Sequence, residues 1–232
     1  MKKIITITTD LKDEFATSQI HAVLARRNFN GKVIENHDVK PYSIVEGAYG
    51  IWQLIKNLPI DSINVGIVDP GVGSRRFGII IKTKKFWFVG PNNGLFWPAS
   101  TLDQIQKVWR IDESYFGKVS NTFHGRDVFI KVAVLLSKNL SPEKFGCNQI
   151  TKKVLTKLEF KNGQIVHIDD YGTLKVWGNN TFELPVVNTF SDISIGKAGI
   201  LKGSSDLLEV FVNQSSAKDY FKVKLGQVIK KL

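Results

Sequence analysis

The chain has 232 residues and a formal net charge of +11, because 32 Lys and Arg stand against 21 Asp and Glu. Hydrophobic residues make up 43% of the chain and charged residues 23%, which is typical of globular domains and excludes wholesale disorder. The single cysteine, Cys147, excludes an intrachain disulfide scaffold, and the apolar run 4–7 is too short for a signal peptide or membrane span. We therefore expect a soluble cytoplasmic protein.

The basic charge does not by itself identify a partner. All six arginines lie within the first 126 residues, and the later basic residues are scattered lysines. No zinc-ligand spacing, aromatic RNA-binding motif or helix-turn-helix accompanies them. We interpret the charge mainly as solvated lysine and expect neither a nucleic-acid nor a membrane partner. The alternative is a nucleic-acid-binding protein, and a steep salt dependence of duplex binding would indicate it.

The first 70 residues predict strands that alternate with helices. Apolar residues recur at helical spacing in two stretches, and Pro59 stops the second. The predicted strands are 4–9, 33–34 and 63–68, and the predicted helices are 13–27 and 44–58. This β-α-β-α-β order favours an α/β fold with a largely parallel central sheet.

The next segment changes character. Residues 78–82 and 86–89 predict a hairpin with a lysine turn. Residues 127–138 predict a helix, with Asp127 placed to cap its N-terminus.

Short strands with turn signals follow from about residue 155. Asn162-Gly163 predicts a hairpin between 158–160 and 164–168. This tail predicts a small all-β domain, a barrel, so we expect an N-terminal α/β domain over 1–152 and a C-terminal β-barrel domain over 153–232.

The most informative segment is Val-Asp-Pro-Gly-Val-Gly-Ser-Arg-Arg at 68–76. It places the carboxylate of Asp69 at the carboxyl end of a strand, where open α/β sheets bind ligands, and its glycines allow close backbone approach. A hairpin follows it instead of a helix, and no Gly-Lys-Ser/Thr occurs, so it is neither a dinucleotide fingerprint nor a P-loop. A Pro-Gly turn with a solvated Asp is an equally good interpretation of this segment alone.

Three further segments could carry chemistry. Thr-Phe-His-Gly-Arg-Asp at 122–127 opens a helix, Gly-Pro-Asn-Asn-Gly-Leu at 90–95 forms a tight turn, and Ile-Asp-Asp-Tyr-Gly at 168–172 could hold a cation. Taken singly, each segment also has a purely structural interpretation. These are a capped helix with a surface His for 122–127, a tight turn for 90–95 and a hairpin corner for 168–172. No zinc-protease, zinc-finger or serine-hydrolase motif is present, so we expect no metal site.

Together these segments resemble the S-adenosyl-L-methionine (SAM) hydrolase family, adenosine-forming, also called SAM hydroxide adenosyltransferases, whose relatives include fluorinase and chlorinase. Seven motifs occur in the family's order over nearly the whole chain, although each alone is weak. They are Thr-Thr-Asp at 8–10, Glu-Gly-Ala at 46–48 after Pro41-Tyr42, and the segments 68–74, 90–95, 122–127, 168–172 and 212–214.

The resemblance implies an N-terminal α/β domain, a C-terminal β-barrel and a homotrimer with SAM bound between neighbouring subunits. It implies attack of water on the ribose C5′ of SAM, giving adenosine and L-methionine, with no cofactor. The family's Asp-Arg-His set falls on Asp69, Arg76 and His124. The halogenating relatives do not retain that set, which favours water or hydroxide as nucleophile.

The residue types suit that reaction. Asp69 and His124 could position and deprotonate water in line with the C5′–S bond, and Arg76 could hold the carboxylate. Which group is the base stays open. A chloride-using halogenase and a non-catalytic SAM- or adenosine-binding protein are the alternatives.

The resemblance also implies a set of substrate-binding residues. Asp10 and Asp13 are expected near the ribose, Tyr42 at the ribose and adenine, Asn93 in a ligand-binding turn, Asp169 at the methionine amino group with Tyr171 beside it, Ser204 and Ser205 at the methionine carboxylate, and Asn213 and Gln214 at the adenine edge. The chain departs from the family pattern in two places. Only two residues separate Asp10 from Asp13, and Tyr-Gly-Thr at 171–173 replaces Phe-Gly-Asn.

Overall fold

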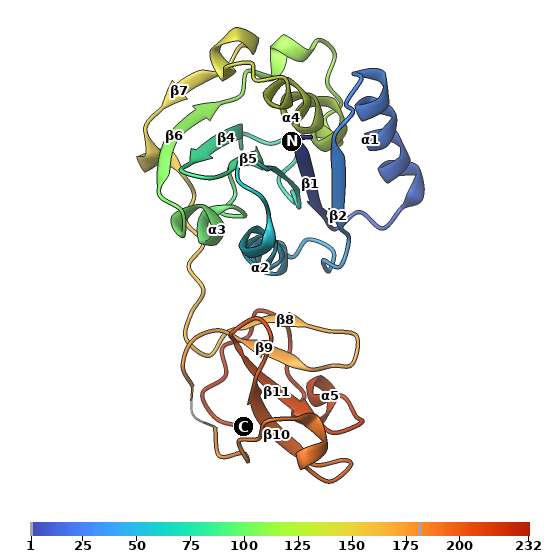
Figure 1. Cartoon of the computed structure of the whole chain (residues 1–232), viewed down its shortest axis with the longest axis vertical. Helices are drawn as coiled ribbons and strands as arrows, with labels where there is room; N and C mark the ends of the chain where they lie inside the picture. The colour runs from blue at the N-terminus through green and yellow to red at the C-terminus, as the bar shows by residue number, and fades with distance from the viewer. Residues whose placement is uncertain (1, 181) are drawn as a thin grey trace. The chain divides into compact units, whose positions relative to one another are not determined.

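The chain divides into two compact units, Met1–Leu158 and Glu159–Leu232 (Figure 1). The computed structural model describes residues 2–180 and 182–232. None of the helices in these ranges is both long enough and apolar enough to cross a bilayer.

The first unit is built on a seven-stranded mixed sheet with strand order β2-β1-β3-β5-β4-β6-β7. The strands are β1 (Ile4–Thr9), β2 (Lys32–Asn36), β3 (Ile63–Ile67), β4 (Gly78–Thr83), β5 (Trp87–Pro91), β6 (Ile105–Arg110) and β7 (Asn148–Ile150). The four strands β2, β1, β3 and β5 run parallel, and β4, β6 and β7 add antiparallel pairs. The predicted β-α-β-α-β order and the β4–β5 hairpin are confirmed.

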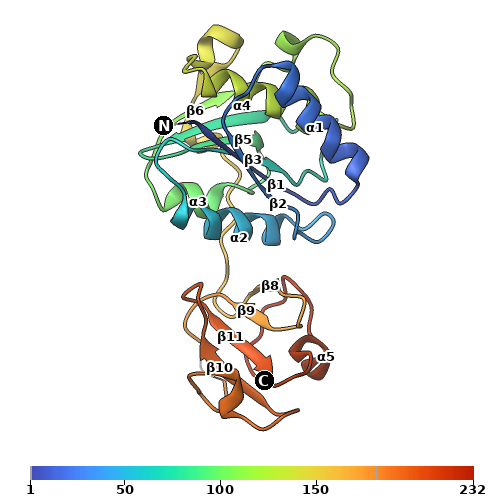
Figure 2. The ribbon, with the colours of Figure 1, turned by 45° about the vertical axis from the view of Figure 1, so that its right-hand side comes forward.

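Helices cover both faces of this sheet. They are α1 (Glu14–Arg26), α2 (Ile44–Leu54), α3 (Trp97–Thr101) and α4 (Ile130–Ser137). Figure 2 shows α1 and α4 on one face and α2 and α3 on the other. The strand β3 is buried at every position because both of its faces are covered, which is typical of central parallel strands.

The entry to α4 differs from the prediction. A π-helical turn, Gly125–Phe129, precedes α4, and His124 occupies the N-cap position. Asp127 therefore lies inside the first turn, where its carboxylate accepts the backbone N–H of Ser120 at 2.9 Å and pairs with Arg126. The prediction that Asp127 caps the helix is wrong, because its carboxylate fastens the preceding loop instead.

The second unit holds a four-stranded antiparallel sheet with order β10-β11-β9-β8. Its elements are β8 (Ile165–Ile168), β9 (Leu174–Val176), β10 (Ala198–Lys202), β11 (Leu208–Val212) and the short helix α5 (Ala217–Phe221). A separate apolar core lies under this sheet, formed by side chains that include Leu174, Ile200 and Val210. The expected small β domain is thus confirmed as a sheet. In residues 159–180 and 182–232 the four strands do not close into a barrel, because β10 and β8 lie at opposite ends of the strand order.

The hairpin predicted at Asn162-Gly163 is also wrong. Residues 158–160 form no strand. The N–H of Ile165 instead donates to the carbonyl of Gln227 at 2.8 Å, and the N–H of Ile229 donates to the carbonyl of Gly163. A distant part of the chain therefore takes the place of the local partner, which the turn signal could not reveal.

Candidate active site

Two carboxylates lie at the carboxyl edge of the parallel strands. Asp10 follows β1 directly, and Asp69 follows β3 after one residue. Since β1 and β3 are parallel neighbours, their carboxyl ends lie at the same edge of the sheet, where α/β proteins bind ligands.

A glycine turn returns the chain from Asp69 to Arg76. The N–H of Val72 donates to the carbonyl of Asp69 at 3.2 Å. Gly73 has φ +75°, and a Cβ there would lie 2.4 Å from the carbonyl oxygen of Asn121. Both the left-handed backbone and the close approach require glycine at this position.

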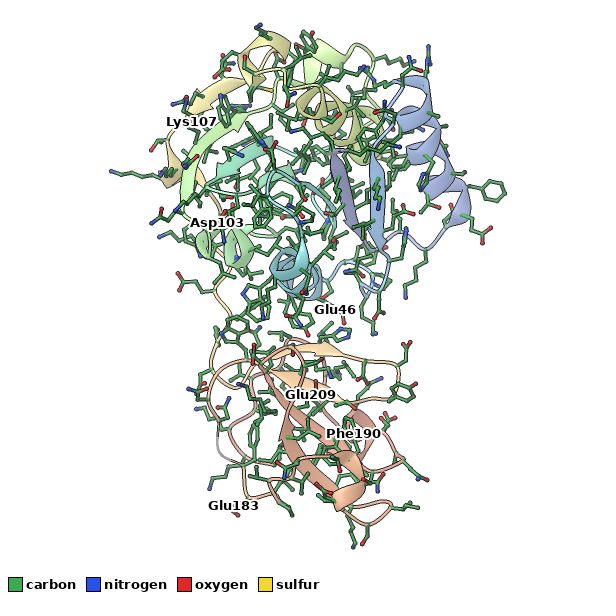
Figure 3. All side chains as sticks on the ribbon, viewed as in Figure 1. Glu46, Asp103, Lys107, Glu183, Phe190 and Glu209 are labelled. Atoms are coloured by element: carbon green, nitrogen blue, oxygen red, sulfur yellow. The ribbon has the colours of Figure 1, made fainter. Side chains whose placement is uncertain are left out.

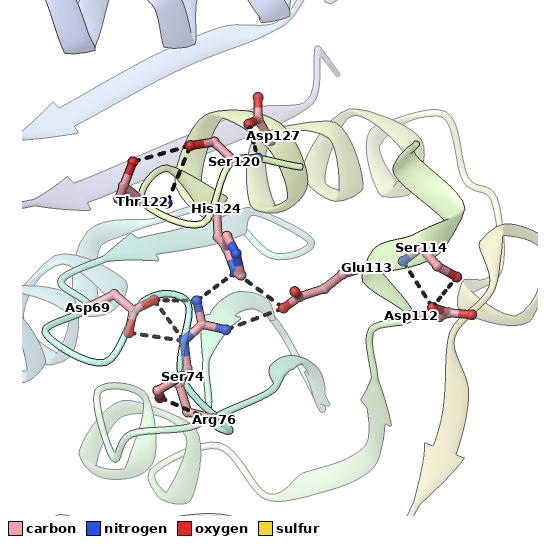
Figure 4. Close-up of polar contacts among 10 residues, drawn as sticks. All are labelled: Asp69, Ser74, Arg76, Asp112, Glu113, Ser114, Ser120, Thr122, His124 and Asp127. Carbon is pink, nitrogen blue, oxygen red and sulfur yellow. Dashed lines mark hydrogen bonds and ion pairs between the residues drawn. The ribbon is translucent and has the colours of Figure 1, made fainter. Parts of the chain in front are cut away.

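The guanidinium of Arg76 joins three side chains (Figure 4). Its Nε lies 3.0 and 2.8 Å from the two carboxylate oxygens of Asp69, and Nη2 lies 2.5 Å from Oδ2. Nη2 also lies 2.8 Å from Nδ1 of His124, and Nη1 lies 3.3 Å from Oε1 of Glu113. The side chains of Arg76, Asp69 and His124 are 9%, 8% and 7% exposed, so these charge-assisted contacts are shielded from water. The neighbouring Arg75 is exposed, so Arg76 is the arginine that points inward.

Close packing places His124 beside this pair. A Cβ on Gly125 would lie 2.5 Å from Cγ2 of Ile67, so the absence of a side chain lets the helix start rest on β3. The ring of Phe129 meets the imidazole edge-on at 6.4 Å between centroids and lies 5.4 Å below the Arg76 guanidinium carbon. Phe129 thus forms an apolar support under both groups.

A cavity of about 240 Å³ opens at this edge of the sheet. Asp10, Tyr42, Asp69 and His124 all line it. The N–H of Tyr42 donates to Oδ2 of Asp10 at 2.7 Å, and the phenol side chain is 76% exposed. Four of the predicted site residues therefore share one cavity, and Arg76 binds two of them from behind.

Two other predicted residues of this unit have structural contacts. The carboxylate of Asp13 accepts the N–H of Phe15 as the N-cap of α1. The amide of Asn93 donates to the carbonyl of Val68 at 2.9 Å and accepts the N–H of Leu95. Neither residue lines the 240 Å³ cavity.

The remaining predicted residues lie in the second unit. A cavity of about 910 Å³ there is lined by Asp169, Tyr171, Ser204, Asn213 and Gln214. Ser205 is 4% exposed and does not line it.

Asp169 is held by its own loop. Its Oδ1 accepts the N–H groups of Tyr171 and Thr173 at 3.1 and 2.9 Å, and its Oδ2 lies 3.6 Å from Nζ of Lys175. Lys175 in turn lies 2.5 Å from the buried carboxylate of Glu209, its direct cross-strand partner. Glu209 is labelled in Figure 3 with Phe190, another residue of the cavity wall.

Sequence reasoning missed Glu113, Lys175 and Glu209. The two residues of the second unit carried a signal, since each is a charge between apolar residues of a short strand. Glu113 carried none, because nothing near it indicates that its loop reaches Arg76. In the described ranges, no cluster of three or more His, Cys, Asp or Glu is arranged to hold a metal ion.

Comparison with known proteins agrees with this geometry. The family model for the SAM hydroxide adenosyltransferase N-terminal domain matches residues 5–146, and that for the C-terminal domain matches residues 173–230. The chain belongs to the SAM hydroxide adenosyltransferase family. The resemblance carried by the seven motifs is thereby confirmed.

Several relatives of this chain carry the name (R)-S-adenosyl-L-methionine hydrolase. The protein from Methanocaldococcus jannaschii is 34% identical over 184 residues, a match that spans 74% of this chain and 65% of the relative. The protein from Thermus thermophilus is 28% identical over 240 residues, and this match spans 92% of each chain. An uncharacterized conserved protein from Thermotoga maritima shares the fold, with a TM-score of 0.85, 24% identity and coverage of 96% of this chain and 97% of that one.

Proposed function

We propose that this protein hydrolyses SAM to adenosine and L-methionine. The observation that carries the proposal is the buried Asp69–Arg76–His124 network at the wall of the 240 Å³ cavity, in a chain of this family. Relatives named (R)-S-adenosyl-L-methionine hydrolase support the same reaction.

The reaction is an in-line displacement at the ribose C5′. The oxygen of water forms a bond to C5′, the C5′–S bond breaks, and its electron pair returns to sulfur as the thioether of methionine. One proton passes from the water to a base at the cavity wall, Asp69 or His124. The sulfonium is a good leaving group, so the enzyme mainly has to align and deprotonate water, and the step requires no cofactor.

Three residues carry the catalytic proposal. Asp69 and His124 border the cavity and are the groups that would hold the water. Arg76 orients Asp69 through its short contacts with both carboxylate oxygens.

The binding proposal divides between the two cavities. In the first unit, Asp10, Asp13 and Tyr42 are proposed at the nucleoside and Asn93 in a ligand-binding turn. The position of Asp10 and Tyr42 in the cavity wall supports their part in this proposal. In the second unit, the proposed residues are Asp169, Tyr171, Ser204, Ser205, Asn213 and Gln214. Asp169 is proposed to bind the methionine ammonium, because its Oδ2 faces a cavity and already pairs with another ammonium, that of Lys175.

We further propose that the chain forms a homotrimer with SAM bound between neighbouring subunits, that its C-terminal domain is the family's barrel, and that it acts in the cytoplasm. Light scattering of the purified protein tests the first of these. A monomeric mass at assay concentration would contradict the trimer.

The direct test is incubation of the purified protein with SAM. We expect adenosine and methionine in equal amounts by chromatography, with the (R) epimer at sulfur consumed first, as the relatives' name specifies. Chloride should leave the product unchanged; a 5′-chloro nucleoside would indicate a halogenase. Bound but intact SAM at every pH would indicate a binding protein and sink the proposal.

A further inference from the structure

The carboxylate of Glu113 completes the Arg76 network from the side opposite Asp69. It comes from the short 3-10 helix Glu113–Phe116, which follows β6, and not from any motif of the candidate site. Its Oε1 lies 3.3 Å from Nη1 of Arg76 and 3.3 Å from Nδ1 of His124. Glu113 does not line the 240 Å³ cavity; it borders a separate cavity of about 520 Å³ with Arg75 and Arg110.

Two carboxylates accept hydrogen bonds from different edges of the Arg76 guanidinium. Asp69 takes Nε and one hydrogen of Nη2, and Glu113 takes Nη1. A guanidinium has five N–H donors in one plane, so acceptors on two of its edges fix its rotation. The remaining Nη2 hydrogen is then aimed at Nδ1 of His124.

This arrangement selects the tautomer of His124. A guanidinium can only donate, so at 2.8 Å Nδ1 of His124 must accept, and the proton of the neutral ring is carried by Nε2. Oε1 of Glu113 lies 3.3 Å from the same Nδ1, but a carboxylate oxygen only accepts, so in this tautomer Glu113 makes no hydrogen bond to the ring and acts on it through Arg76. Nε2–H is therefore the polar group that the imidazole can offer to the cavity.

We propose that Glu113 is a positioning residue of the reaction: by anchoring Arg76 it holds His124 in the Nε2–H tautomer, as a hydrogen-bond donor to the attacking water or its hydroxide. This inference rests on the proposed function, and it leaves Asp69 as the group that accepts the water's proton. Glu113 acts through Arg76 and touches no substrate.

The test combines kinetics with the nitrogen spectrum of the ring. Glu113→Ala should lower kcat for SAM about 10- to 100-fold, which corresponds to the value of one hydrogen bond to a charged group, with KM within about twofold. Long-range ¹H–¹⁵N correlation at alkaline pH should show a single Nε2–H tautomer for His124 in the wild type and a mixture in Glu113→Ala. Glu113→Gln, which has the same shape and keeps an acceptor for Nη1, should lie between the two and serves if the alanine variant does not fold.

Asp112→Ala is the matched control. Asp112 caps the same 3-10 helix by accepting the N–H of Ser114 at 3.0 Å. Its loss should lower stability but leave kcat and the His124 tautomer unchanged. Wild-type kcat in both Glu113 variants, an Nδ1–H tautomer in the wild type, or a lower kcat with an unchanged tautomer would each overturn the proposal. If the wild type does not hydrolyse SAM, the proposed function fails, while the spectra still decide whether Glu113 sets the tautomer.

Discussion

Replacement of Asp69 by Asn separates catalysis from binding most sharply. The amide has the same shape but no charge, and it keeps only one acceptor oxygen for the contacts that Arg76 now makes with two. Removing one partner of a buried ion pair commonly costs about 3–5 kcal/mol. Here Glu113 still pairs with Arg76 and the amide oxygen still accepts, so we expect a loss of about 1–3 kcal/mol in the free energy of unfolding.

The loss of turnover should be much larger than the loss of binding. An amide cannot take a proton from water, and a positioned general base contributes about 10²–10⁴-fold to the rate. We expect kcat for adenosine release to fall by that factor, while the Kd for SAM by calorimetry stays within about threefold. Asp103→Asn is the control: the Asp103 carboxylate accepts the N–H of Lys85 in a turn and lines neither cavity, so its replacement should leave both values unchanged. A kcat within tenfold of wild type, or a Kd that rises in step with the fall in kcat, would refute this role for Asp69.

Three further predictions address packing and charge. Gly125→Ala should lower the free energy of unfolding measured in urea by about 1–3 kcal/mol, because the new Cβ would clash with Ile67. The clash should also displace His124, so kcat should fall by a larger factor than KM rises. Unchanged kinetics would contradict the inference that Gly125 positions His124. Burial raises the pKa of the Cys147 thiol to about 12, so iodoacetamide at pH 8 should label only the unfolded protein, which mass spectrometry can check. The hydrogen bond from Arg126 lowers the pKa of Asp127 in the folded protein below its ordinary 3.8. The ionised carboxylate therefore stabilises the fold above pH 3.8, and this stabilisation is lost as the pH falls through the pKa of the folded protein. The difference in Tm between wild type and Asp127→Asn should therefore become smaller in acid, and a constant difference would contradict the prediction.

The parts of the fold that the sequence predicts well are those that local pattern controls. The strands β1 and β3 are apolar runs with turn signals at their ends, and their parallel order follows from the helices between them. That order alone places Asp10 and Asp69 at one edge of the sheet. By contrast, the partner of Ile165 is Gln227, more than 60 residues away, and no local signal selects a partner at that separation.

The candidate site shows the same division. Asp69, Arg76 and His124 belong to recognisable motifs, so the resemblance could name them in advance, although the local pattern alone does not distinguish Arg76 from its neighbour Arg75. Packing decides this, since the Gly73 turn and the Phe129 ring place Arg76 over the sheet edge. Glu113 could not be named, because its part depends on a tertiary contact between a loop after β6 and a side chain after β3.

Two clusters of paired charges, one in each unit, have a net charge opposite in sign to that of the chain as a whole. Asp69 and Glu113 surround one arginine, and Asp169 and Glu209 surround one lysine, so each cluster carries one net negative charge when its carboxylates are ionised and any imidazole is neutral. SAM carries a sulfonium and an ammonium against one carboxylate, so its net charge is positive. Solvent-exposed charges lose influence over roughly 8–10 Å at physiological salt, whereas buried pairs are screened much less. The two clusters therefore place negative charge close to the cavities, whereas the +11 of the chain comes mainly from scattered lysines and is no specific attraction for a positively charged ligand.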